Sequence, residues 1–171
     1  MSQNNLPRDY VHDKDRLDEI ARLRLHEDRV DEILNAYSKQ AAAEFNLPIS
    51  MISVVLDEAQ VTAGVHGLEG WIAESGGIPV EWSFCANSVE SKKPFIVENA
   101  VDHKKTKYNP LVTMDGIRCY AGVPLRTSNG HIIGNFCVVG TEERSFSEDE
   151  INRLKEFAEK AVAQIEARLE D

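Results

Sequence analysis

Apolar side chains recur every three to four residues near both ends of the chain, which is the spacing of a helix with one buried face. One stretch, Asp28–Phe45, is followed by the helix-ending residues Asn46 and Pro48. The other, Ser147–Glu170, opens with the S-x-x-E pattern of a capping box. A shorter charged stretch, Asp13–His26, predicts a third helix. The two long stripes consist of Val30, Ile33, Leu34, Tyr37, Ala41 and Phe45, and of Ile151, Leu154, Ala158, Ala161, Ile165 and Leu169.

Between these helices the pattern changes to the alternation typical of strands, interrupted by short helical segments. Ser83–Ser91 predicts a short helix with Ser83 as its N-cap. The letters NPLV predict a helical turn in the connection 98–116, and glycines and a proline over 67–79 predict a loop. Strands are predicted at Ser50–Leu56, Val61–His66 and Pro94–Val97, and on both sides of Asn129-Gly130. The order indicates an α+β domain with a central antiparallel sheet of five to six strands and the end helices on one face.

The stretch IRCYAGVPLRTSNGHIIGNFCVVG, residues 117–140, fixes which side chains share a face of the sheet. Asn129-Gly130 favours a two-residue type I′ turn, because both central residues of that turn need positive φ. This turn pairs Gly122 with Cys137, and alternation then separates two faces. The apolar face holds Ile117, Cys119, Ala121, Val123, Leu125, Ile132, Gly134, Phe136 and Val138, and the mixed face holds Arg118, Tyr120, Gly122, Pro124, Arg126, Ile133, Asn135, Cys137 and Val139.

The mixed face predicts a small-molecule site. Gly122 opposite Cys137 leaves room above the sheet, and a mostly apolar concavity with a few polar groups is typical of ligand pockets. Arg118 would offer a cationic fork for a carboxylate or phosphate, and Tyr120 a ring and a hydroxyl. A second interpretation remains open, in which Arg118 pairs with a loop carboxylate such as Asp115.

Composition narrows the possible partners. The chain of 171 residues has 29 acidic and 19 basic side chains, and a net charge of -10 disfavours nucleic acid and anionic membranes. The only basic cluster, Lys104, Lys105 and Lys107, is read as a solvated loop. No apolar run has the length of a membrane span, and the N-terminus lacks the features of a secretory signal. Three scattered cysteines indicate free thiols, so a cytoplasmic protein is expected.

The strings SFCANSV, PFIVENA, YNPLV, IRCYAGVPL, GNFCVVG and SFSEDE together resemble a bacterial GAF domain, over Asp28–Leu169. The resemblance implies a sheet between a helical layer and a layer of ligand-binding loops and short helices. It further implies homodimerisation through the end helices and regulation by a small molecule, with a possible effector protein or domain. We expect a GAF domain over residues 28–171, preceded at 1–27 by a tail and a short helical arm. The chain could be a stand-alone sensor or a fragment of a longer protein.

The resemblance also bears on ligands and cofactors. Bilin attachment needs a cysteine that usually neighbours a histidine, and no cysteine here does. A lone His66 or His103 is a weak basis for haem, and the cysteine spacing argues against zinc. We therefore expect no metal, haem or bilin, and a polar or anionic ligand of unknown identity. The predicted ligand-binding residues are Arg118, Tyr120 and Cys137 on the sheet, Trp82, Phe84, Cys85, Tyr108 and Leu111 in the walls, and Asp102 and His103 at the mouth.

Two alternatives remain beside this non-catalytic sensor. One branch of the fold reduces free methionine sulfoxide with pocket cysteines, which requires a low-pKa thiolate and a second thiol within disulfide reach. Cys85 and Cys137 are the pair that could meet, whereas Cys119 is predicted on the opposite face of the sheet. The other alternative is a dimerisation module whose pocket is filled by its own side chains. Large side chains packed over Gly122 would favour it.

Overall fold

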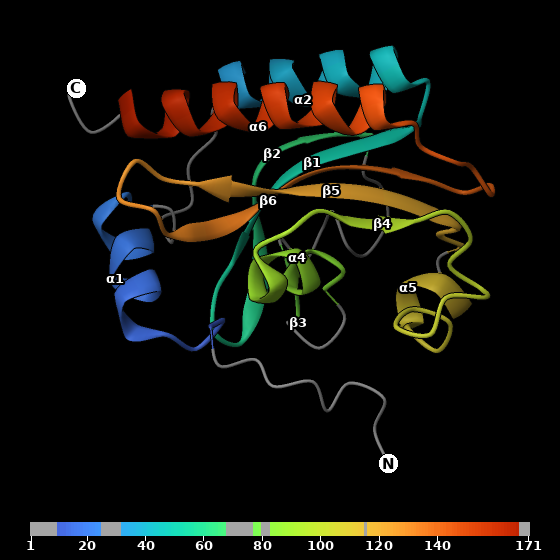
Figure 1. Ribbon diagram of the computed structural model, residues 1–171, viewed down its shortest axis with the longest axis horizontal. Coiled ribbons are helices and arrows are strands. Elements are labelled where there is room, and N and C mark those ends of the chain that lie inside the picture. Colours follow the sequence, from blue (N-terminus) through green and yellow to red (C-terminus); the bar gives the residue numbers. More distant parts are fainter. Residues whose placement is uncertain (1–9, 25–31, 68–76, 80–82, 115, 168–171) are drawn as a thin grey trace.

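The protein folds around a six-stranded antiparallel sheet with the strand order β3-β2-β1-β6-β5-β4 (Figure 1). The computed structural model describes residues 10–24, 32–67, 77–79, 83–114 and 116–167. The three-residue strand β3 lies where glycines and a proline predict a loop, so that part of the prediction is wrong. The strands are β1 (Ile49–Val55), β2 (Ala59–His66), β3 (Gly77–Pro79), β4 (Phe95–Val97), β5 (Cys119–Arg126) and β6 (Ile132–Gly140).

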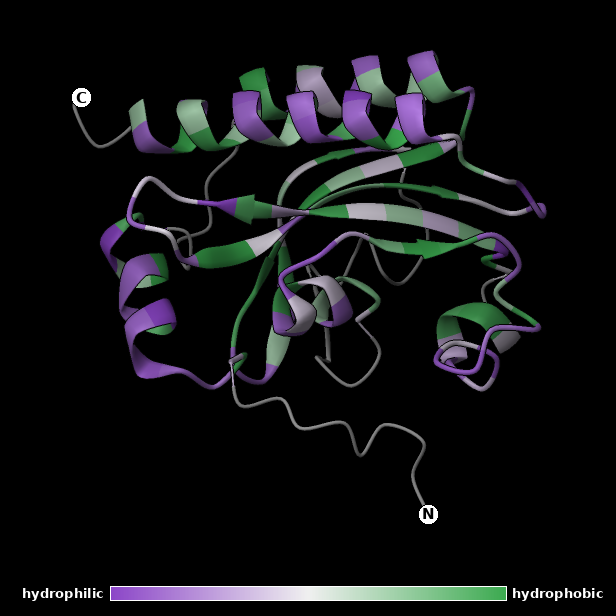
Figure 2. Cartoon of the chain, in the orientation of Figure 1, coloured by the Kyte–Doolittle hydropathy of each residue, from purple (hydrophilic) through white to green (hydrophobic). Residues whose placement is uncertain are grey.

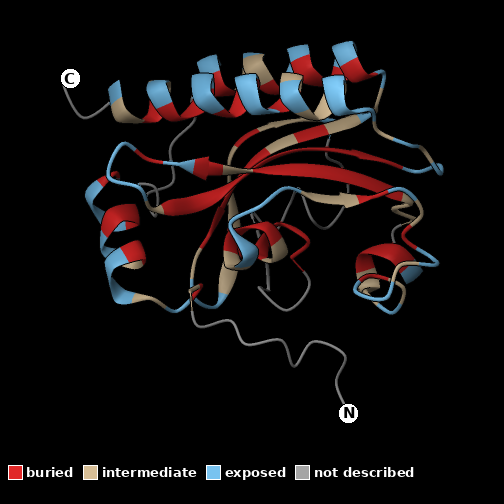
Figure 3. Ribbon diagram, in the orientation of Figure 1, coloured by how far each residue is buried: buried red, intermediate tan, exposed pale blue. Residues whose placement is uncertain are grey.

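Two long helices cover one face of the sheet, and shorter helices lie on the other side and at one end (Figure 1). The long helices, α2 (Glu32–Phe45) and α6 (Glu148–Ala167), confirm the two amphipathic stretches. Ile33 of the first predicted stripe is nevertheless 47% exposed, and Val30 and Leu169 lie outside the described residues. Figures 2 and 3 show hydrophilic, exposed positions along the outward side of both helices and buried positions along the side toward the sheet. The other helices are α1 (Lys14–Arg22), α4 (Cys85–Ser91) and α5 (Pro110–Thr113). No helix that the structure describes is long and apolar enough to cross a bilayer.

The ends of the long helices follow from their sequence. Ser147 Oγ accepts a hydrogen bond from the Glu150 backbone N–H at 3.1 Å, and the Glu150 carboxylate accepts one from the Ser147 N–H at 3.0 Å. These reciprocal bonds confirm the predicted capping box and begin α6. Asn46 adopts a left-handed conformation with φ of 54°, which ends α2 after Phe45.

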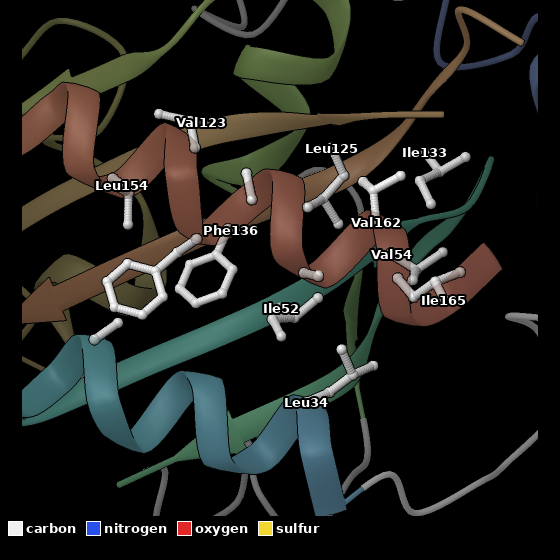
Figure 4. Close-up of a cluster of buried hydrophobic side chains, with 14 of the residues drawn as sticks. Leu34, Ile52, Val54, Val123, Leu125, Ile133, Phe136, Leu154, Val162 and Ile165 are labelled. Atoms are coloured by element: carbon white, nitrogen blue, oxygen red, sulfur yellow. The ribbon is translucent and has the colours of Figure 1, made fainter. Parts of the chain in front are cut away.

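The face beneath α2 and α6 carries a large apolar core (Figure 4). Phe136 on β6 stacks on Phe157 of α6 with ring centroids 5.5 Å apart, and Ile52 on β1 contributes to the same cluster. Leu34 and Ile165, from the two predicted stripes, are both fully buried there. Burial of this apolar area is the main contribution that holds the helical layer on the sheet.

The β5–β6 register matches the prediction from Cys119 to Leu125 and departs from it near the turn. The predicted type I′ turn is wrong, because Gly130 has a positive φ of 87° but Asn129 does not. Gly122 pairs with Cys137, as expected, but an irregularity between Leu125 and Arg126 moves the next pair to Arg126 and Ile132. A one-residue irregularity reverses the faces of the residues beyond it. Ile133 therefore packs in the helix-side core and Ile132 in the cluster on the opposite face, which is the reverse of the prediction. Ile117, also predicted on the helix side, packs against the opposite cluster as well.

Candidate functional site

The second face of the sheet carries its own buried cluster, which is formed with α4, α5 and the loops beside them and is called the loop-side cluster. Ser83 positions α4, because its Oγ accepts a hydrogen bond from the Ala86 N–H at 3.1 Å, although the N-cap residue is Phe84 rather than the predicted Ser83. The helix itself begins at Cys85, whose side chain is 1% exposed. Phe84 packs edge-on against the ring of Tyr120, with centroids 5.2 Å apart. The start of α4 is thereby held directly over the centre of the sheet.

A chain of buried polar groups runs beneath α4. The Tyr120 hydroxyl donates to Cys85 Sγ at 3.0 Å, and Cys85 Sγ lies 3.5 Å from Ser53 Oγ. Ser53 Oγ also accepts from Gln60 Nε2 at 3.2 Å, and Gln60 Oε1 accepts from the Ser83 hydroxyl. Each hydrogen bond offsets part of the desolvation cost of its buried groups. The network joins β1, β2, β5 and α4 into one polar unit.

The two cysteines of this network differ in acidity. Burial raises the pKa of Cys85, but hydrogen bonds with Cys137, Ser53 and Tyr120 outweigh burial and leave the pKa below its ordinary value. The hydrogen bond to Cys85, together with burial, raises the pKa of Cys137 well above its ordinary value. Burial and the adjacent thiols likewise raise the pKa of Tyr120. Of these three groups, Cys85 is therefore the first to carry a negative charge.

The space above Gly122 is occupied by two neighbouring side chains. A Cβ at this position would lie 2.5 Å from Asn135 Oδ1 and would also collide with the Tyr120 hydroxyl. Glycine is required here because these side chains cross its backbone closely. The sequence predicts a cavity at this point, and the structure fills it with Tyr120 and Asn135 instead.

Asn135 has one hydrogen-bonding atom without a partner. Its Nδ2 donates to Ser88 Oγ, and the Ser88 hydroxyl donates to the Cys85 carbonyl at 3.0 Å. Asn135 Oδ1 has no hydrogen-bond partner within the part of the chain that the structure describes, although the residue is 0% exposed. A buried acceptor without a donor costs about 1–3 kcal/mol, and ligands or water commonly supply the missing donor.

Several predicted site residues meet at this network, and others lie elsewhere. Phe84, Cys85, Tyr120 and Cys137 are all buried in the loop-side cluster, together with Leu111 of α5. Tyr108 is 70% exposed, and the Asp102 carboxylate accepts from the side chain of Asn99 at 3.2 Å on the surface. His103 packs edge-on against Phe95, outside the polar network, and burial lowers its pKa. Trp82 lies outside the described residues.

Arg118 supports a loop rather than facing the network. Its guanidinium Nη1 donates to the carbonyls of Val112 and Ile117, at 2.8 and 2.9 Å. These bonds tie β5 to the end of α5. Asp115, the alternative carboxylate partner, lies outside the described residues.

Cys119 differs from the other two cysteines. Its sulfur lies near Gly140 and Leu47, the latter a residue packed against the helix-side core, and burial raises its pKa. The prediction that Cys119 and Cys137 lie on opposite faces is therefore confirmed. Sequence reasoning did not select Ser53, Gln60, Ser88 or Asn135 for the site. The available signal was their polarity within otherwise apolar strands and a short helix, where a buried polar group needs a specific reason.

A shallow groove of about 420 Å³ lies between α6 and the exposed edge of β5. Val123, Ala158 and Val162 are its buried apolar residues, and Arg126 and Lys155 are among its charged ones. It is separate from the network beneath α4. Within the described part of the chain, no three acidic, histidine or cysteine side chains are grouped as metal ligands would be.

Comparison with known proteins identifies relatives of this chain. A sequence model described as the GAF domain matches residues 27–166. The chain is also 32% identical over 148 residues to a cyclic di-GMP phosphodiesterase of Pseudomonas aeruginosa, and this alignment covers 85% of the chain and 24% of that protein. The chain therefore spans about a quarter of the length of the curated relative it matches.

Solved structures share the fold at low sequence identity. The GAF domain of an Acinetobacter phosphoenolpyruvate-protein phosphotransferase aligns with a TM-score of 0.64 at 17% identity, covering 91% of this chain and 95% of that one. The type II free methionine-R-sulfoxide reductase of Thermoplasma acidophilum aligns with a TM-score of 0.62 at 14% identity, covering 87% and 94%. The sequence match over most of the chain and the common sheet and helix arrangement lead to one conclusion: this chain belongs to the GAF domain family.

Proposed function

We propose that this chain is a non-catalytic regulatory domain that senses a small polar ligand beneath α4. The observation that carries the proposal is the fully buried Asn135 with its unpartnered Oδ1, next to the hydroxyl of Tyr120. The network offers hydroxyl, amide and thiol groups, and its described members include no Lys, Arg, Asp or Glu. An anion would be buried there without a counter-charge, so these contacts favour an uncharged polar group with an N–H or O–H donor.

Ligand entry requires Tyr120 to leave its position above Gly122. Rotation of the Tyr120 side chain would break the hydrogen bond from its hydroxyl to Cys85 and open the volume above Gly122 that the side chain now fills. A ligand would thus favour a second arrangement of α4 over the sheet, which is what a population shift needs. The filled site also matches the dimerisation module without ligand, and binding experiments separate the two.

The test is a screen of small polar metabolites by thermal shift, with hits confirmed by calorimetry and native mass spectrometry. A true ligand raises the melting temperature, and its affinity falls at least about tenfold in Asn135→Leu, which removes the acceptor. Arg118→Ala is the matched control, because its side chain serves the α5 loop. Loss of binding in Arg118→Ala with full binding in Asn135→Leu would move the site to that loop. Absence of any ligand-dependent shift would favour the module without ligand.

We also propose a homodimer formed through the outward faces of α2 and α6, in a cytoplasmic protein with reduced thiols. The support is Ile33, a large apolar residue that is 47% exposed on α2. The similarity to part of a cyclic di-GMP phosphodiesterase supports a role beside an effector activity on the same or another chain. Light scattering of the wild-type protein and of Ile33→Glu tests the dimer, and a monomeric wild-type protein would contradict it.

A second candidate function is reduction of free methionine sulfoxide, favoured by the contact of Cys85, Cys137 and Tyr120. In this reaction the two thiols would become a disulfide while the sulfoxide oxygen leaves as water, and an added dithiol would restore them. Turnover that is lost in Cys85→Ser and Cys137→Ser but kept in Cys119→Ser would establish it. Because the non-catalytic reading is our first proposal, we expect no turnover in any of the four proteins.

A further inference from the structure

The N-terminal arm, residues 10–24, is bonded to the far end of α4. Both oxygens of the Glu90 carboxylate accept backbone N–H groups of the arm, from Tyr10 at 3.1 Å and from Val11 at 2.9 Å. The Val11 side chain is 0% exposed and packs in the loop-side cluster that contains Cys85. Hydrogen bonds to a charged acceptor are among the stronger ones in proteins.

A second set of bonds fixes the arm to the sheet. The Ile132 N–H donates to the Tyr10 hydroxyl at 2.8 Å, and the Ile132 carbonyl accepts from the Arg16 guanidinium at 3.3 Å. Arg16 is 0% exposed, and it also donates to the carbonyls of Tyr10 and Val11, at 3.1 and 2.7 Å. β1 pairs with β6 only as far as Gly134, so these side chains satisfy the backbone of β6 beyond the end of that pairing.

The arm and the candidate site therefore share one short rigid element. α4 has seven residues, with Cys85 of the polar network at its first position and Glu90, which holds the arm, near its last. A helix this short moves as a unit, so lifting its first turn off the sheet strains the bonds at its last turn. The arm lies N-terminal to residues 27–166, which the GAF domain model matches.

We propose that the N-terminal arm is a clamp that holds α4 closed over the site, so that release of the arm opens the site and opening of the site loosens the arm. This inference rests on the proposed function only for the location of the ligand. Thermodynamic reciprocity requires the coupling to act in both directions. A change in the hydrogen-bonded network beneath α4 would thereby change how firmly residues 10–24 are held.

The experiment measures the two ends of α4 separately, without any ligand. In a Cys119→Ser background, the reaction of Cys85 and Cys137 with a chromogenic aromatic disulfide reports opening of the site. Hydrogen–deuterium exchange of peptides from residues 10–24 reports release of the arm. Glu90→Gln weakens the hold on the arm from the helix, and Tyr10→Phe weakens it from the arm itself. Glu98→Gln is the control, because it makes the same chemical change at an exposed carboxylate in the loop after β4.

We expect roughly tenfold faster thiol reaction in Glu90→Gln and a smaller increase in Tyr10→Phe, each with faster exchange in the arm and the control unchanged. The Tyr10→Phe result is decisive, because the hydroxyl that it removes bonds to Ile132 of β6 and not to α4. Faster arm exchange with unchanged thiol reaction in Tyr10→Phe would overturn the clamp. If Glu90→Gln does not fold, Tyr10→Phe alone carries the test. Because no ligand is used, failure of the clamp is distinct from failure of the proposed sensing function.

Discussion

The two faces of the central sheet differ in what is buried beneath the helices that cover them. Beneath α2 and α6, apolar side chains such as Phe136, Ile52 and Leu34 interlock, and stability comes from burial. Beneath α4, Ser53 and Asn135 lie among apolar neighbours and are completely buried. A buried polar network contributes less to folding stability than a well-packed apolar core, but its hydrogen bonds select one arrangement of the side chains. The comparison shows that the helical face is packed like a protein core, and it supports the proposal that a ligand acts on the loop face.

The largest effect is expected from a charge placed in the helical face. Ile165 is 0% exposed in the core, so Ile165→Asp would bury a carboxylate without a partner and should cost more than about 4 kcal/mol of folding free energy. Circular dichroism during urea unfolding measures the loss. The surface substitution Val101→Asp, in the loop after β4, is the control, because Val101 is 46% exposed, and it should change stability by less than about 1 kcal/mol. A fully stable Ile165→Asp protein would show that α6 is packed in another register.

A polar-to-apolar change in the loop face should have a much smaller effect. Asn135→Leu removes the unpartnered Oδ1 together with the hydrogen bond from Nδ2 to Ser88, and keeps a side chain of similar size. Its unfolding free energy should stay within about 1 kcal/mol of the wild-type value, because the loss of a costly buried acceptor offsets the loss of one hydrogen bond. Urea unfolding measures this. A loss as large as that of a core truncation would remove the distinction between the two faces.

The acidity of Cys85 sharpens the description of the loop face. Tyr120→Phe removes a hydrogen bond that lowers the pKa of Cys85, so this pKa should rise and the thiolate fraction at neutral pH should fall. The pH dependence of alkylation, followed by mass spectrometry of the Cys85 peptide, measures the shift. The pKa of Cys119, on the opposite face, should not change in this variant. An unchanged Cys85 profile would remove the hydroxyl from the network in solution.

The smallest expected effect is at the capped end of α6. Hydrogen bonding to Arg144 lowers the pKa of Glu150 despite partial burial. The ionised form is thus favoured in the folded state, so its stabilisation is present above the ordinary glutamate pKa and is lost as the pH falls through the lower folded value. Because the pair is partly exposed, Glu150→Gln should cost below about 1 kcal/mol at pH 7 and reduce the acid dependence of stability. An unaltered acid-unfolding curve would contradict this.

The elements and most of the register could be predicted because they depend on local patterns. The Asn129-Gly130 signal led to the correct pairing of Gly122 with Cys137 although the turn is not of type I′, and the face of Cys119 followed from alternation. The irregularity at Leu125 was not visible, since a turn signal does not specify a bulge, and it reversed Ile132 and Ile133. A short sequence pattern does not predict a bulge, because packing against the rest of the fold decides the backbone conformation there.

The candidate site was predictable only in part, for a related reason. Tyr120 and Cys137 share a strand face by alternation, and Cys85 follows from the short helix. Ser53 and Gln60 come from β1 and β2, and their bonds to Cys85 and Ser83 depend on how three elements meet. Arg118 could not be placed, because its partners are the backbone carbonyls of Val112 in α5 and of Ile117, and a sequence pattern does not encode where such carbonyls point.

The short strand β4 has a consequence for behaviour at high concentration. β4 covers β5 only from Tyr120 to Gly122, and no strand in the described ranges pairs with the rest of that edge, from Val123 to Arg126. An open strand edge is where chains join edge to edge into aggregates and fibrils. Pro124 lies in the middle of this stretch and has no N–H to offer, while Arg126 adds a charge. The one proline of β5 thus serves as a gatekeeper against self-assembly, and its replacement by valine would extend the surface on which fibrils nucleate.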